Sequence, residues 1–158
     1  MTDTTNQRKI AHIRIIEEDR GIDRRKNYFD EVCLTHRALP EINRDDVDPS
    51  VRFMGKSLSF PLLISSMTGG DHEVARTINQ NLALAAESAG VAMGVGSQRV
   101  MFTNHAAKES FSIRAQAPTS LLFANLGGVQ LNHGFGLDEC RAAVETLQAD
   151  GLYLHLNP

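Results

Sequence analysis

The sequence of 158 residues lacks a long apolar run, which excludes a membrane-spanning segment within it. A helix that crosses a bilayer needs about 20 consecutive apolar residues, and the polar start MTDTTNQRKI is also unlike the apolar core of a secretory signal. An excess of charge of one sign is lacking too, since 16 basic and 19 acidic residues give a net charge of −3. We therefore expect a cytoplasmic protein with no nucleic-acid or membrane partner.

Cysteine is scarce, and several catalytic motifs are missing. Cys33 and Cys140 have no CxxC spacing, so we expect two reduced, partly buried thiols rather than a disulfide or a metal site. The sequence shows no paired His/Glu metal motif, no nucleophile elbow and no phosphate loop with its lysine. Gly94 and Gly96 begin a GxGxxG pattern, but Arg99 occupies the third glycine position. We predict no metal ligand among these residues.

Four short apolar runs are present, at residues 61–66, 91–96, 120–127 and 151–157. Nearly continuous runs of this length are typical of parallel strands that are buried on both faces. They recur about every 30 residues, which is the size of a βαβ unit. The sequence therefore predicts an α/β fold with four parallel strands.

Helical patterns separate these runs, at residues 71–90, 104–118 and 136–151. The first two have recognisable ends, because Gly90 closes one and Asn104 is a plausible N-cap for the other. The apolar residues expected to face the sheet lie at helical spacing in the first and third patterns: Val74, Ile78 and Leu82, then Leu137, Cys140, Val144 and Leu147.

Residues 1–60 do not follow this repeat. They begin with a helical pattern around RKIAHIRIIEEDR, and residues 51–61 predict two short strands that turn at Met54-Gly55-Lys56. We therefore divide the chain into an N-terminal extension, residues 1–60, which closes one end of the sheet, and the strand–helix repeat of residues 61–158.

All four predicted strands end in polar or glycine-rich segments: SSMTGG (65–70), GSQR (96–99), NLGG (125–128) and HLN (155–157). Ligands of parallel α/β folds collect at the carboxyl ends of the strands. The contrast with the apolar strand bodies predicts a binding site at this edge of the sheet.

The residues at these strand ends allow more than one interpretation. The hydroxyls after the first strand suit a planar heterocycle, although the glycines alone favour a simple turn. Arg99, next to Ser97 and Gln98, is either a solvated cation or part of an anion site. Asn125 is a structural bridge or a ligand contact, and His155 is a core or a ligand-facing histidine.

Taken together, the motifs resemble one family, the type II, flavin-dependent isopentenyl-diphosphate isomerases. The segments that carry the resemblance are RKIAHI (8–13), THRALPE (35–41), FPLLISSMTGG (60–70), INQNLALAAESAGVAMGVGSQR (78–99), FANLGGVQL (123–131) and GLYLHLNP (151–158). The resemblance implies a (β/α)8 TIM barrel that interconverts isopentenyl and dimethylallyl diphosphate. It also implies FMN as an acid/base in its reduced form, NADPH as the reductant, Mg2+ at the diphosphate, and a homo-oligomer at full length.

The resemblance also implies roles for individual residues. Cofactor contacts to FMN are expected from Ser65, Ser66, Met67, Thr68, Ser97 and Asn125. Substrate contacts to the diphosphate are expected from Arg8, Lys9, Ser97, Gln98 and Arg99. His155 is expected to be catalytic and to face both the substrate and the flavin.

The chain departs from the family at its end. Family members continue with Leu-Gln-Glu, which includes the metal ligand, and with four further βα units that carry the FMN phosphate site. We therefore expect the N-terminal half of a barrel, with little or no isomerase activity when alone. Two alternatives stay open: an FMN-dependent barrel oxidoreductase, and a non-catalytic half-barrel.

Overall fold

The structure is a computed structural model that describes residues 4–19, 21, 28–66 and 68–156; of residues 4–6, 8, 9 and 28 it describes the backbone alone. The chain divides into two compact units, residues 1–48 and 49–158. The first contains α1 (Thr4–Glu18) and two short 3-10 helices, η1 (Tyr28–Glu31) and η2 (Arg44–Asp46). The helix predicted near the N-terminus is therefore confirmed.

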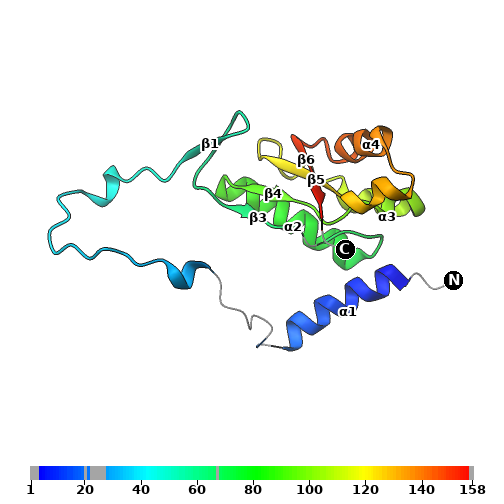
Figure 1. Cartoon of the computed structure of the whole chain (residues 1–158), viewed down its shortest axis with the longest axis horizontal. Coiled ribbons are helices and arrows are strands. Elements are labelled where there is room, and N and C mark those ends of the chain that lie inside the picture. Colours follow the sequence, from blue (N-terminus) through cyan, green and yellow to red (C-terminus); the bar gives the residue numbers. More distant parts are fainter. Residues whose placement is uncertain (1–3, 20, 22–27, 67, 157–158) are drawn as a thin grey trace. The chain divides into compact units, whose positions relative to one another are not determined.

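A four-stranded parallel sheet forms the centre of the second unit (Figure 1). Its strands are β3 (Leu63–Ile64), β4 (Ala92–Gly94), β5 (Leu122–Gly127) and β6 (Gly151–His155), and their order in the sheet is their order in the chain. All neighbours are parallel. The predicted α/β fold with four parallel strands is confirmed, and consecutive parallel neighbours are the arrangement found in a (β/α)8 barrel.

Two of the three predicted helices are confirmed, as α2 (Glu73–Ala89) and α4 (Leu137–Leu147). The predicted helix 104–118 is wrong. That region instead holds the 3-10 helix η3 (His105–Phe111), and a short helix, α3 (Val100–Thr103), precedes it. Asn104 separates them, because its backbone is extended and its side-chain oxygen accepts a hydrogen bond from the Ala106 amide at 3.1 Å. After β5 the chain forms another 3-10 helix, η4 (Gly128–His133).

The buried face of α2 is offset by one residue from the predicted stripe. Ala75, Asn79, Ala83 and Ala86 are buried, whereas Ile78 and Leu82 are only half-buried and Val74 is exposed. Small side chains on this line allow the helix to approach the sheet closely. In α4, similarly, Ala143 and Leu147 are buried whereas Leu137 is exposed.

The alternation of each strand gives the sheet two separate apolar cores. On one face, Met93, Leu122 and Leu126 pack with residues of the helices and of η3, including Phe111 and Leu147. We call this face the outer face.

The opposite, inner face carries a smaller core, made of Leu58, Ala92, Leu121 and Phe123 with Leu63 and Tyr153 against it. Leu58 belongs to a hairpin of β1 (Val51–Phe53) and β2 (Lys56–Leu58), which confirms the predicted turn. The hairpin covers the inner face near the amino ends of the strands.

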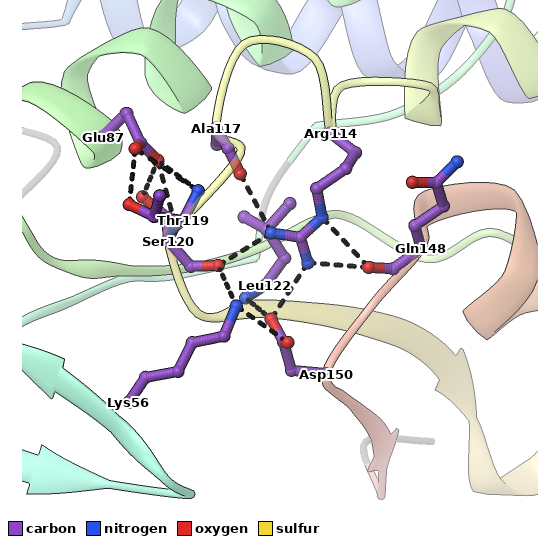
Figure 2. Close-up of polar contacts among 9 residues, drawn as sticks. All are labelled: Lys56, Glu87, Arg114, Ala117, Thr119, Ser120, Leu122, Gln148 and Asp150. Atoms are coloured by element: carbon purple, nitrogen blue, oxygen red, sulfur yellow. Dashed lines mark hydrogen bonds and ion pairs between the residues drawn. The ribbon is translucent and has the colours of Figure 1, made fainter.

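A polar network surrounds the amino ends of β5 and β6 (Figure 2). Asp150 accepts hydrogen bonds from the Leu122 amide at 2.8 Å and from Arg114 at 2.9 Å, and it pairs with Lys56 at 2.8 Å. Burial opposes the ionisation of Asp150, but these donors outweigh it and lower its pKa. The network therefore connects the hairpin, the loop after η3 and two strands.

Glu87, near the end of α2, joins the same region. Its carboxylate accepts hydrogen bonds from both the amides and the hydroxyls of Thr119 and Ser120, at 2.5–3.3 Å. Burial would raise the pKa of Glu87, but the four donors prevail and lower it to about 2. The carboxylate thus holds the segment that leads into β5.

Two further expectations concerned the cysteine thiols and membrane-spanning segments. Both cysteines are free; Cys140 is half-buried as predicted, whereas Cys33, in the first unit, is exposed and not partly buried. Within the described residues, no helix is long and apolar enough to cross a membrane.

Candidate functional site

Hydrogen bonds join the segments that follow three neighbouring strands. The Gly96 amide, after β4, donates to the Thr68 carbonyl, after β3, at 2.7 Å. The Gln98 amide donates to the Asn125 carbonyl of β5 at 2.8 Å. The predicted polar strand ends are therefore neighbours at one edge of the sheet.

Asn125 connects this edge to β6. Its side-chain amide donates to the Val95 carbonyl at 3.0 Å, and its side-chain oxygen lies 2.7 Å from Nδ1 of His155. Asn125 is buried, with 4% of its surface exposed, whereas His155 is half-buried. The structural bridge and the ligand contact considered for Asn125 are thus compatible, because one side chain spans three strands and ends beside the histidine ring.

Two glycines on the inner face of these strands leave space for neighbouring rings. A Cβ at Gly127 would lie 3.0 Å from Nε2 of His155, and one at Gly94 would lie 3.0 Å from the Tyr153 ring and 3.5 Å from Cβ of Ser66. Tyr153 in turn stacks on Phe123 with ring centroids 4.7 Å apart, and burial raises the pKa of its hydroxyl. The glycines therefore leave room for the Tyr153 and His155 rings of the neighbouring strand, which pack on the inner face.

The side chain of Gln98 is not accessible to a phosphate group. Its side chain is fully buried; its amide nitrogen donates to the Ala143 carbonyl of α4 at 2.9 Å, and its oxygen accepts from the Asn125 amide at 3.0 Å. A buried amide that is satisfied by backbone groups is unavailable to a diphosphate. This burial is at odds with the predicted substrate contact, and it makes Gln98 a support for Asn125.

Two buried polar residues support the loop after β3, and the sequence analysis missed both. Asn79 of α2 accepts a hydrogen bond from the Thr68 hydroxyl and donates to the Ser110 carbonyl at 2.8 Å. The Ser110 hydroxyl accepts from the Gly70 amide at 3.3 Å. The signal in the sequence was Asn79, a polar residue at helical spacing from Ala75 and Ala83. The predicted apolar stripe through Val74 drew attention to a different face of the helix.

The remaining predicted site residues differ in exposure. Ser66, Thr68 and Ser97 are half-buried at the strand ends, whereas Ser65 and Arg99 are exposed. Arg99 directly precedes α3 and makes no capping hydrogen bond with its side chain. Ser97 and Arg99 are thus placed next to the strand-end segments, in positions that a ligand can reach.

For three predicted site residues the structure describes no side chain. Arg8 and Lys9 lie on α1, in the first unit, and only their backbone is described. Met67 lies outside the described residues. Their predicted contacts with substrate and FMN stay predictions.

Charge at the described strand ends comes from few groups. In the described part of the chain, no cluster of three or more His, Cys, Asp or Glu side chains could hold a metal ion. The two carboxylates with lowered pKa values, Glu87 and Asp150, belong to the network at the amino ends. The described site therefore offers hydroxyls, an amide, an imidazole and the guanidinium of Arg99.

Comparison with known proteins identifies the family. Residues 6–120 match the family model described as FMN-dependent dehydrogenase. The chain belongs to this family. The flavin-binding resemblance that the motifs indicated is thereby confirmed.

Curated relatives in the same comparison are more specific. The chain is 59% identical to an isopentenyl-diphosphate delta-isomerase of Paracoccus zeaxanthinifaciens, with 100% of this chain and 46% of the relative covered. It is 55% identical to an enzyme of that name from Hydrogenovibrio crunogenus, with coverages of 96% and 44%. A third, from Nostoc, is 52% identical, with coverages of 98% and 44%. The chain therefore spans about half the length of these relatives, which fits half of a (β/α)8 barrel.

Proposed function

We propose that the protein to which this chain corresponds converts isopentenyl diphosphate to dimethylallyl diphosphate. The observation that carries the proposal is the combination of the FMN-dependent family match with 52–59% identity to three proteins named isopentenyl-diphosphate delta-isomerase. The strand ends support it, since Ser66, Thr68, Ser97, Asn125 and His155 offer hydrogen-bonding groups there.

FMN fits the chemistry of the described strand ends, where the half-buried hydroxyl residues Ser66, Thr68 and Ser97 lie on segments joined by hydrogen bonds. In our proposal the flavin is held there by Ser65, Ser66, Met67, Thr68, Ser97 and Asn125. When bound and reduced, a flavin supplies a nitrogen that can give or take a proton at an unactivated alkene. NADPH is proposed as the reductant.

The chain's own residues bind and orient the substrate. Arg8, Lys9 and Arg99 are proposed to neutralise the diphosphate, with Ser97 as a hydrogen-bond donor. His155 is proposed to contact the reacting part of the substrate, because its ring lies on the inner face beside Gly127. Gln98 is proposed to position Asn125 instead of touching the substrate.

Mg2+ does not fit the described residues as a resident ion, since they contain no suitable ligand cluster. We therefore assign it no ligand in this chain and derive no step from it. Its involvement stays an expectation from the resemblance.

A chimera tests the proposal. This chain would replace the matching segment of the Paracoccus zeaxanthinifaciens isomerase, and isopentenyl diphosphate would be supplied with FMN, NADPH and Mg2+ without oxygen. We expect dimethylallyl diphosphate to form. A folded chimera that binds FMN but yields no product would contradict the proposal. The 158-residue chain alone, in the same assay, is expected to give little or no product.

The second candidate is an FMN-dependent oxidoreductase, which the description of the matched family favours. It predicts net oxidation of a substrate and lasting reduction of the flavin. The isomerase reaction leaves the redox state of the substrate unchanged. Adding the substrate to the chimera with oxidised FMN, without NADPH and without oxygen, separates the two: an oxidoreductase reduces the flavin and bleaches its absorbance, whereas the isomerase does not.

A further inference from the structure

We propose that Asn125 is a positioning residue that fixes the tautomer of His155: in the neutral ring, the proton is on Nδ1 and Nε2 is the acceptor. The two side chains meet at 2.7 Å between Oδ1 of Asn125 and Nδ1 of His155. Its bearing on isomerisation rests on the proposed function, whereas the tautomer itself does not.

The orientation of the Asn125 side chain is fixed independently of the histidine. Its nitrogen lies 3.0 Å from the Val95 carbonyl, which can only accept a hydrogen bond. The opposite orientation would place two oxygens against each other and direct the amide hydrogens elsewhere. The oxygen of Asn125 must therefore face His155, and an oxygen without hydrogen requires a donor at Nδ1.

The backbone of Asn125 is held as firmly as its side chain. Its amide donates to Oε1 of Gln98 at 3.0 Å, and its carbonyl accepts from the Gln98 amide at 2.8 Å. Gln98 is itself anchored to the Ala143 carbonyl of α4 at 2.9 Å. Asn125 and Gln98 are both buried, so the relay from α4 to the histidine consists of hydrogen bonds away from water.

The consequence concerns the other ring nitrogen. With Nδ1 occupied as a donor, the neutral ring presents a lone pair at Nε2, beside the bare backbone of Gly127. Such a nitrogen accepts a proton or a hydrogen bond from an O–H or N–H group of a ligand. It can donate to an anion such as a phosphate oxygen only after the ring has taken up a proton. The contact thus places the basic lone pair of the neutral His155 ring on Nε2 and not on Nδ1.

Nitrogen–proton NMR of the flavin-free 158-residue chain tests the tautomer directly. The spectrum would be recorded at a pH at which the His155 ring is observed to be neutral, with the other histidines as internal references. We expect a protonated Nδ1 and an unprotonated Nε2. A neutral ring with its proton on Nε2 would overturn the proposal, and this measurement needs no variant.

Variants add a second readout. Asn125→Leu removes the acceptor and is expected to shift the His155 tautomer ratio about tenfold toward the Nε2 proton, the size expected for one lost buried hydrogen bond. Asn125→Asp keeps an acceptor and is expected to retain the Nδ1 proton. Asn43→Ala, in the first unit, is the control and should change nothing at His155. An unchanged ratio in a folded Asn125→Leu chain would contradict the assignment.

These outcomes are separate from those of the proposed function. If the chimera forms no dimethylallyl diphosphate while His155 carries its proton on Nδ1, the proposed function fails and the positioning role of Asn125 stands. If the chimera is active and the proton lies on Nε2, the reverse holds.

Discussion

Single residues at the strand ends differ in what the sequence could predict. Asn125 and His155 are close, as follows from the rule that the carboxyl ends of parallel strands meet at one edge of the sheet. In the structure, Oδ1 of Asn125 lies 2.7 Å from Nδ1 of His155. The direction of Gln98 did not follow, because a polar residue after a strand can turn toward the ligand or toward the helices. Asn79 was missed because sequence periodicity does not distinguish a buried asparagine from a solvated one on the edge of a helix face.

The role of His155 can be tested in the chimera. We expect His155→Ala to lower the isomerase turnover number by about 100- to 10,000-fold, as when an acid/base group is removed. His133→Ala, at an exposed position of η4, is the control and should retain turnover. Equal activity of the two variants in a product assay would exclude a catalytic role for His155.

Gly96 provides a prediction on stability. A Cβ there would lie 2.4 Å from the Thr68 carbonyl oxygen, so Gly96→Ser must displace the loop after β3. We expect the free energy of unfolding to fall by about 1–3 kcal/mol. Gly136→Ser is the matched control, because the nearest atom to a Cβ there is 3.8 Å away. Urea denaturation measures the free energy of unfolding of both variants. Equal losses would show that the close approach at Gly96 is unimportant.

Helices and strands were predictable where their ends carry local signals. Gly90 closes α2 in a left-handed conformation with φ of 65°, as the sequence indicated. The region after β4 was not predictable, because Asn104 looks the same as the start of a long helix and as a break between α3 and η3. Its place is decided by tertiary contacts, among them a 2.5 Å hydrogen bond from Nδ2 of the Asn104 side chain to Oδ2 of Asp71.

The hydrogen bonds of Glu87 predict an acid-sensitive part of the stability. Its pKa is lowered from an ordinary 4.5 to about 2, so its contribution is complete above the higher value and is lost as the pH falls toward the lower one. We expect Glu87→Gln to lower the free energy of unfolding at pH 7 by about 1–3 kcal/mol. The difference from the unmodified chain should shrink as the pH falls from about 4.5 toward 2.

Chemical denaturation at a series of pH values measures this difference. Glu145→Gln, at an exposed position of α4, is the control and should follow the unmodified chain throughout. A Glu87→Gln difference that is independent of pH would mean that the charge of Glu87 does not matter.

At the scale of the whole molecule, the four-stranded sheet has two edge strands, β3 and β6. Among the described residues, β6 pairs with β5 alone, and an apolar groove of about 250 Å³ lies beside it, lined by Cys140, Arg141, Val144, Glu145 and Leu152. Leu154 of β6 is 44% exposed. The number of parallel strands was predictable from the repeat length, but the extent of this uncovered edge follows only from the structure.

We expect the 158-residue chain to self-associate through this edge as its concentration rises, because an unpaired apolar strand accepts another chain. Leu154→Lys should weaken the association, as measured by sedimentation velocity. Leu84→Lys, at an exposed position of α2 away from β6, is the control. Association that is unaffected by Leu154→Lys but lost with Leu84→Lys would place the contact on α2.

The network of Lys56, Glu87, Arg114 and Asp150 and the pair Asn125–His155 lie toward opposite ends of the strands. Asp150 directly precedes β6 and His155 ends it, and these five residue steps correspond to about 16 Å along the strand. At that separation, free-energy changes are expected to be additive, so Glu87→Gln and His155→Ala should show almost no coupling in a double-mutant cycle. Such independence would let substitutions accumulate at the reactive end of the sheet while the amino end keeps the fold intact, which is a favourable starting point for the evolution of new specificities.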